Sequence, residues 1–165
     1  MMKRIILLFL LAVLLSPAAA AQDAAPLLGP LTIEDLLDLP EWFGEDFIGY
    51  LPDPQYADQL ETALADVEMV CVLGTWCSDS KREVPRMLRI MQYANIPPEK
   101  LRMIGVDREK QSPGGEAAPY QVTLVPTFIF LRDGKEIGRI VEAPLATLEK
   151  DILGIVLKTG PEGTE

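Results

Sequence analysis

The chain has 165 residues, a formal net charge of −10, two cysteines and no histidine. The negative charge disfavours binding to nucleic acid and to anionic membrane surfaces, and solubility alone is enough to explain it. Without histidine, the chain cannot build a zinc site from cysteine and histidine, nor a Cys-His or Ser-His catalytic pair. We therefore expect neither a metal nor a cofactor.

Residues 1–21 have the composition of an export signal. Lys3 and Arg4 precede a short apolar run, and a stretch of small residues follows it. The apolar run is too short to span a bilayer comfortably. The pattern predicts cleavage near Ala21, a periplasmic or secreted protein, and no stable membrane insertion after cleavage. An uncleaved anchor is the alternative.

The rest of the chain has the length of one domain with a real core. Residues 22–30 show no usable periodicity and predict a tether. Thr32 stands at an N-cap position with Asp35 three residues later, which predicts a short helix. An aromatic-rich stretch follows, which we expect to pack on the core rather than to bind a ligand. We interpret residues 22–53 as a tether and an N-terminal extension.

The next segments predict a helix, a strand and a second helix. An Asp-Pro pair at residues 53–54 marks the start of a helix over residues 54–65. The apolar run at residues 67–73 is typical of a strand buried on both faces. Residues 78–95 carry apolar side chains on one face and predict a helix with Pro85 inside it.

The C-terminal half predicts a second strand, a hairpin and a closing helix. Residues 101–106 form the strand, and an Asp-Gly turn joins residues 122–131 to residues 135–141. Residues 145–157 predict the closing helix, and residues 159–165 a polar tail. The strand–helix–strand order implies a parallel pair and the hairpin an antiparallel one, so the sheet is expected to be mixed.

Several residues, in matching register, resemble the thioredoxin superfamily. That family has Trp-Cys-x-x-Cys-Lys where this chain has Trp-Cys-Ser-Asp-Ser-Lys. The matching residues are Trp76, Cys77, Lys81, Pro85, Val125, Pro126 and Thr127, together with the Asp-Gly hairpin, and Ser80 stands where the family has its second cysteine. The resemblance covers residues 54–158 as the thioredoxin-like domain. It implies an α/β thioredoxin-like fold: a central mixed β-sheet flanked by helices, here with an N-terminal helical and aromatic-rich extension.

The resemblance also implies a site. It implies a cis bond between Val125 and Pro126 that faces Cys77, and a groove in which a bound polypeptide pairs with the backbone before the proline. Cys77 and Ser80 are the candidate catalytic residues. The candidate substrate-binding residues are Trp76, Ser78, Asp79, Val125, Pro126 and Thr127.

Three positions depart from the family pattern. Ser80 replaces the resolving cysteine, so no disulfide can form within the motif. Cys71 stands where many members bury an acid, and we expect it to be an inert small hydrophobe. A disulfide between Cys71 and Cys77 is excluded if the chain between them is extended, since their Cα atoms would lie about 20 Å apart. Glu142 replaces a frequent glycine and is expected to place a carboxylate beside the groove.

The surroundings of Cys77 bear on its ionisation. A cysteine in the first turn of a helix faces unpaired N–H groups and the positive end of the helix dipole, which favour the thiolate. A hydrogen bond from Ser80 and the positive charges of Lys81 and Arg82 would favour it further. Asp79 would oppose it, unless its role is to stabilise the helix start.

Three functions follow from this pattern. The first is thiol–disulfide exchange by Cys77 alone, with polypeptide disulfides and an external low-molecular-weight thiol. The second is a non-catalytic binding module that uses the groove at Trp76 and Pro126 to hold a polypeptide. The third is a dimer joined by a Cys77 disulfide. We favour the first and expect a monomer.

Overall fold

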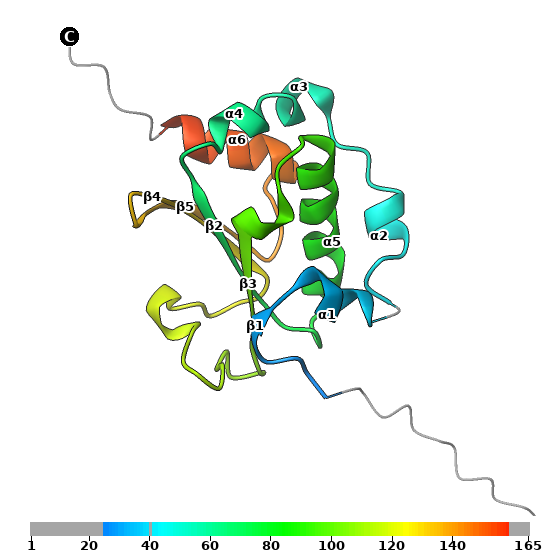
Figure 1. Cartoon of the computed structure of the whole chain (residues 1–165), viewed down its shortest axis with the longest axis vertical. Coiled ribbons are helices and arrows are strands. Elements are labelled where there is room, and N and C mark those ends of the chain that lie inside the picture. The colour runs from blue at the N-terminus through cyan, green and yellow to red at the C-terminus, as the bar shows by residue number, and fades with distance from the viewer. Residues whose placement is uncertain (1–24, 40, 159–165) are drawn as a thin grey trace, which may run out of the picture.

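A mixed sheet of five strands forms the centre of the computed structural model, which describes residues 25–39 and 41–158 (Figure 1). The strands, in spatial order, are β1 (Gly29–Leu31), β3 (Leu101–Gly105), β2 (Glu68–Leu73), β4 (Thr127–Arg132) and β5 (Lys135–Val141). β2 and β3 run parallel, and the other neighbouring pairs run antiparallel. The α/β fold with a mixed sheet is confirmed.

Six α-helices and two short 3-10 helices are present in the described part of the chain. The α-helices are α1 (Ile33–Leu37), α2 (Glu45–Ile48), α3 (Pro54–Ala57), α4 (Leu60–Ala63), α5 (Ser78–Tyr93) and α6 (Leu148–Lys158). The 3-10 helices are η1 (Pro98–Lys100) and η2 (Ala118–Tyr120). Among these described helices, none has the length and hydrophobicity that crossing a bilayer requires.

The two faces of the sheet are covered differently. One face packs against the helices in the larger core, which includes Met69, Cys71, Phe128, Phe130, Met87 and Ile152. The other face is covered by the loop between β3 and β4, through a smaller core of Val70, Val72, Ile104, Val106, Ala117, Val125 and Ile129. Alternation along the strands produces this division, because successive side chains point to opposite faces.

The prediction of one continuous helix at residues 54–65 is wrong, because the structure has two short helices there, α3 and α4. Asp53 caps the start as expected, since its carboxylate accepts from the Gln55 N–H at 2.9 Å. The side-chain amide of Gln59 then donates to the Gln55 carbonyl at 2.7 Å, and the Gln59 backbone N–H turns to Tyr56, three residues back. The side chain thus takes the acceptor that would have continued the helix, which separates α3 from α4.

The predicted tether at residues 22–30 is wrong at its C-terminal end, because β1 begins at Gly29 and pairs antiparallel with β3. A strand of three residues is too short to show alternation, and glycine and proline are weak strand formers, so the sequence pattern concealed it. The close approach needs Gly105 in β3, where a Cβ atom would collide with the Leu27 carbonyl. Leu36 and Trp42, farther along the predicted extension, are buried in the larger core.

The other aromatic residues of the extension pack against that core as predicted, namely Phe43, Phe47 and Tyr50. The capping box of Thr32 and Asp35 at α1 is also confirmed.

The predicted hairpin is present, but β4 begins only at Thr127, after a loop. The closing helix begins at Leu148 rather than residue 145. The backbone N–H of Leu145 donates to the Asp151 carboxylate, so this N–H has a partner outside the helix. The Leu145 side chain is exposed.

The predicted signal peptide at residues 1–21, its cleavage near Ala21 and the predicted tail at residues 159–165 lie outside the described residues. The starting boundary of the thioredoxin-like domain at residue 54 stays a prediction.

Candidate functional site

Cys77 occupies the turn between the central strand β2 and helix α5. It is the N-cap residue of α5, and its backbone N–H donates to the Gly74 carbonyl at 2.9 Å. Its side chain is half-buried, and Sγ lies 3.1 Å from the carbonyl oxygen of Val125, to which the thiol donates. The sulfur is therefore accessible from one side and held against the loop before β4 on the other.

The Val125–Pro126 peptide bond is cis, as the resemblance implied. Two hydrogen bonds shape the loop around it. The Thr127 hydroxyl donates to the Leu124 carbonyl at 2.7 Å, and the Glu142 backbone N–H donates to the Pro126 carbonyl at 2.7 Å. β4 follows directly and pairs with β2, which brings this loop to the same sheet end as Cys77.

Trp76 is fixed against the end of β3. Its indole N–H donates to the Val106 carbonyl at 2.9 Å, and the ring lies over Gly74 so closely that a Cβ atom there would overlap it. The preceding residue, Thr75, accepts a hydrogen bond from the Leu27 N–H at 3.1 Å. The sequence pattern does not predict this bond, because Leu27 lies 48 positions from Thr75.

Ser80 is fully buried, and its hydroxyl oxygen accepts from the Gly74 N–H at 3.2 Å. The hydroxyl therefore holds the turn that carries Cys77, whereas the thiol itself bonds to Val125. The expected hydrogen bond from Ser80 to Cys77 is absent from the described bonds; the recorded partners are the Gly74 N–H for the Ser80 oxygen and the Val125 carbonyl for the Cys77 thiol.

The charged residues beside Cys77 are paired with one another or with neighbours. Asp79 lies in the first turn of α5 and forms an ion pair with Arg82 at 2.8 Å. Arg82 also contacts Glu83, and the Lys81 ammonium lies 3.0 Å from Glu41. Their influence on the Cys77 sulfur is therefore smaller than that of isolated charges. Ser78, the first residue of α5, is exposed.

The remaining departures from the family pattern have distinct surroundings. Cys71 is fully buried in β2, where burial raises the pKa of its thiol, and both cysteines are free, as predicted. Glu142 adopts a φ of 60°, a left-handed conformation that glycine tolerates best. Its backbone N–H bonds to the Pro126 carbonyl, so the residue lies next to the cis proline, and the position of its carboxylate beside a groove stays a prediction.

Two cations near Trp76 were not predicted. The Arg108 guanidinium carbon lies 4.8 Å from the ring centroid, and the Lys110 ammonium nitrogen lies 5.6 Å from it. In sequence they belong to a polar loop with mixed charges, and only the fold brings them over the indole. Among the described residues, no cluster of side chains suited to a metal ion is present.

No protein-family model matches the chain. A thioredoxin-like protein of Acanthamoeba polyphaga mimivirus is 31% identical over 101 residues, which cover 58% of this chain and 70% of that protein. The TPR repeat-containing thioredoxin TDX of Arabidopsis thaliana is 31% identical over 79 residues, or 48% of this chain. The match spans only 19% of that protein's length. The crystal structure of oxidised mitochondrial thioredoxin 3 from Saccharomyces cerevisiae aligns over 53% of this chain and 76% of its own, with 32% identity and a TM-score of 0.39.

Proposed function

The chain belongs to the thioredoxin-like superfamily, and from this premise we propose that it catalyses thiol–disulfide exchange with Cys77 as its only nucleophile. One observation carries the proposal: the half-buried Cys77 sulfur lies at the start of α5, 3.1 Å from the Val125 carbonyl and beside a cis proline. The relatives named as thioredoxins support a redox role for this site.

In the first step, the Cys77 thiolate attacks one sulfur of a partner disulfide. The partner S–S bond breaks, its second sulfur leaves as a thiolate with the bonding electrons, and a mixed disulfide forms on Cys77. The first-turn amides of α5 favour the anionic sulfur. Once ionised, Cys77 no longer donates to the Val125 carbonyl, which becomes available to accept an N–H from a bound polypeptide.

In the second step, an external low-molecular-weight thiolate attacks the mixed disulfide and releases Cys77 as a thiolate. Ser80 has no sulfur with which to resolve the intermediate, and Cys71 is fully buried within β2. The two steps together exchange one thiol for another on the partner and require no net oxidant.

Mass spectrometry of the reduced protein after incubation with oxidised glutathione tests this proposal. We expect a glutathione adduct on the wild type and on Cys71→Ala, and none on Cys77→Ser. Release of the adduct should require added thiol. A wild type that acquires no more adduct than Cys77→Ser would overturn the proposal.

A second candidate function is binding of a polypeptide in the same groove without turnover. Its support is that Lys81 and Arg82 are paired with acids, and that the Cys77 thiol is already bonded to Val125. Pull-down from a periplasmic extract separates the two candidates. Under this alternative, Cys77→Ser retains the partner, whereas a covalent exchange enzyme loses it.

We also propose export and a monomeric state, in keeping with the predicted signal peptide. N-terminal sequencing of the protein recovered from the periplasmic fraction should find a start near residue 22. Non-reducing electrophoresis should give a monomer band, whereas a Cys77-dependent dimer would favour the third hypothesis.

A further inference from the structure

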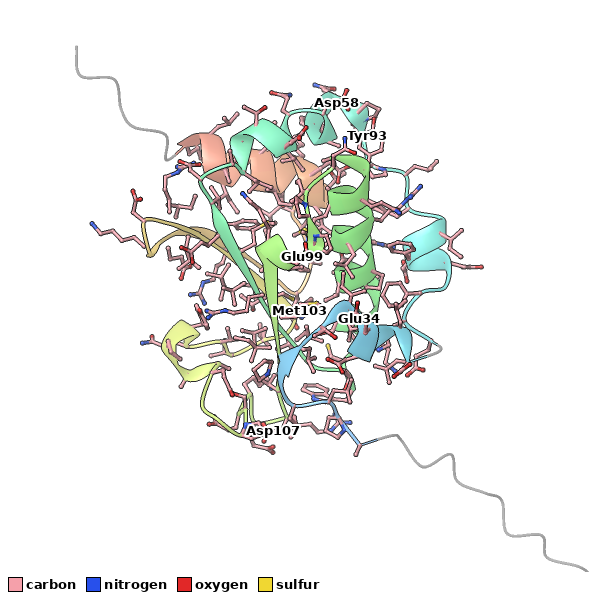
Figure 2. All side chains as sticks on the ribbon, viewed as in Figure 1. Glu34, Asp58, Tyr93, Glu99, Met103 and Asp107 are labelled. Atoms are coloured by element: carbon pink, nitrogen blue, oxygen red, sulfur yellow. The ribbon has the colours of Figure 1, made fainter. Side chains whose placement is uncertain are left out.

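The loop that follows β3 folds back towards the motif. The Gln111 backbone N–H donates to the Asp107 carboxylate at 2.7 Å, and the Lys110 N–H donates to the Asp107 carbonyl at 3.1 Å. Lys110 adopts a φ of 63°, which reverses the chain direction. Asp107 therefore closes a tight loop at the end of the molecule opposite Asp58 and Tyr93 (Figure 2).

This loop places two cations over the aromatic ring beside the nucleophile. The Trp76 indole N–H donates to the carbonyl of Val106, the residue immediately before the loop. This bond fixes the ring next to the start of the loop. Arg108 and Lys110 lie 4.8 and 5.6 Å from the ring centroid, within the range of cation–π contacts. Trp76 and Cys77 both pack against the smaller core, so the two cations over the indole lie on the same side of the sheet as the sulfur.

Among the described residues, no ion pair neutralises the charges of Arg108 and Lys110, in contrast to those of Lys81 and Arg82 on α5. The Lys110 ammonium donates one hydrogen bond, to the Arg108 carbonyl at 2.7 Å. Arg108 is exposed and Lys110 is half-buried. A cation held against a ring keeps N–H groups that can bind a carboxylate, and its position is partly fixed beforehand.

Resting on the proposed exchange reaction of Cys77, we propose that Arg108 and Lys110 determine its specificity, by selecting disulfides that carry a carboxylate close to the reacting sulfur. The carboxylate could come from an acidic residue flanking a polypeptide cysteine or from a small peptide thiol such as glutathione. The chain as a whole has a net charge of −10, and Asp107 and Glu109 alternate with the two cations in the loop. The selection therefore rests on direct contact of the carboxylate with Arg108 and Lys110 and not on the net charge of the loop.

The test uses three tripeptides with a central cysteine flanked on both sides by glutamate, glutamine or lysine, each activated as a 2-pyridyl disulfide. The Cys77 thiolate attacks the peptide sulfur, the S–S bond breaks, and 2-thiopyridone leaves with the bonding electrons and takes a proton from water. The absorbance of 2-thiopyridone gives the rate. We expect the wild type to react about three-fold to ten-fold faster with the glutamate peptide than with the lysine peptide, and added salt to reduce this ratio.

The double variant Arg108→Gln/Lys110→Gln should lose this preference. The matched control is Arg102→Gln/Lys150→Gln, which removes the same charges from two other cation–π contacts, over Tyr120 and Tyr56. The control should keep the preference. Equal rates of the wild type with all three peptides, or equal loss of preference in both double variants, would overturn the assignment.

The outcomes also distinguish failure of the charge preference from failure of the proposed thiol–disulfide exchange by Cys77. If the wild type releases no more 2-thiopyridone than Cys77→Ser, the exchange function and the inference both fail. If it reacts without charge preference, only the inference fails. A parallel measurement with oxidised glutathione identifies the source of the carboxylate. Dependence of that rate on Arg108 and Lys110 indicates a small thiol, and dependence confined to the glutamate tripeptide indicates a polypeptide.

Discussion

At Ser80 a hydroxyl group occupies the place where a sulfur would complete a dithiol. The hydroxyl oxygen is fully buried and accepts the Gly74 N–H, so this side chain supports the turn around Cys77 as well as leaving the motif without a second thiol. Serine in place of the second cysteine therefore changes the chemistry of the motif, while its hydroxyl oxygen still gives the Gly74 N–H a hydrogen-bond partner.

This geometry predicts the effect of Ser80→Cys. Cys77 and Ser80 lie three residues apart at the start of α5, so their side chains are neighbours, and a disulfide between Cys77 and the introduced thiol is expected on oxidation. Thiol titration should find two fewer reactive thiols after mild oxidation, and the glutathione adduct on Cys77 should be released without added thiol. A Ser78→Cys variant, with its new thiol in the adjacent exposed position, is the control and should leave release dependent on added thiol. Unchanged release from Ser80→Cys would contradict this reading of the site.

Among the elements, helix α6 and the extension before α3 are joined by one buried carboxylate. Glu149 is 1% exposed, accepts from the Tyr50 hydroxyl at 2.8 Å and accepts from the Asp53 N–H at 2.9 Å. Burial raises the pKa of Tyr50, and the hydrogen bond to Glu149 raises it further. The neutral tyrosine is thus the form that holds the two elements together.

The raised pKa gives a direction to the pH dependence of stability. Above the ordinary tyrosine pKa of about 10, the unfolded chain loses the Tyr50 proton while the folded protein keeps it. The folded state then binds more protons, so the free energy of unfolding falls as pH rises, and the contribution is complete only below about pH 10.

Urea unfolding of the wild type and of Tyr50→Phe between pH 8 and pH 11 measures this dependence. At pH 8 the variant should lose about 1–2 kcal/mol, because Glu149 loses a buried donor. The difference between the two proteins should shrink above about pH 10. Tyr56→Phe, at an aromatic residue that does not bond to Glu149, is the control. A difference that stays constant up to pH 11 would show that Tyr50 does not titrate as described.

At the scale of the whole molecule, the sequence predicted what depends on local patterns. The strand–helix–strand unit, the hairpin, the cap of α1 and the position of Cys77 at the start of α5 all follow from residues close together in the chain. The missed features depend on distant partners. The Thr75 hydroxyl accepts from the Leu27 N–H, and β1 pairs with β3. The cations over the Trp76 ring belong to a loop about 30 residues later in the chain.

The pairing of β1 with β3 shows why the segment before α1 belongs to the folded unit. β3 would otherwise be an edge strand with unpaired N–H and C=O groups, and β1 covers that edge. The same segment supplies the Leu27 bond to Thr75 beside the motif and packs Leu31 against the larger core. Its removal should therefore weaken the fold and expose a strand edge to other copies of the chain.

A chain that begins at Thr32 tests this expectation against a control that begins at Ala25. The shorter chain should lose about 2 kcal/mol or more in the free energy of unfolding, from lost hydrogen bonds and lost burial of a leucine. It should also self-associate as its concentration rises, because the uncovered edge of β3 can pair with a second copy. Urea unfolding and light scattering measure the two effects. If the two chains have equal stability and both remain monomeric, β1 does not protect the sheet, and the domain boundary belongs closer to residue 54.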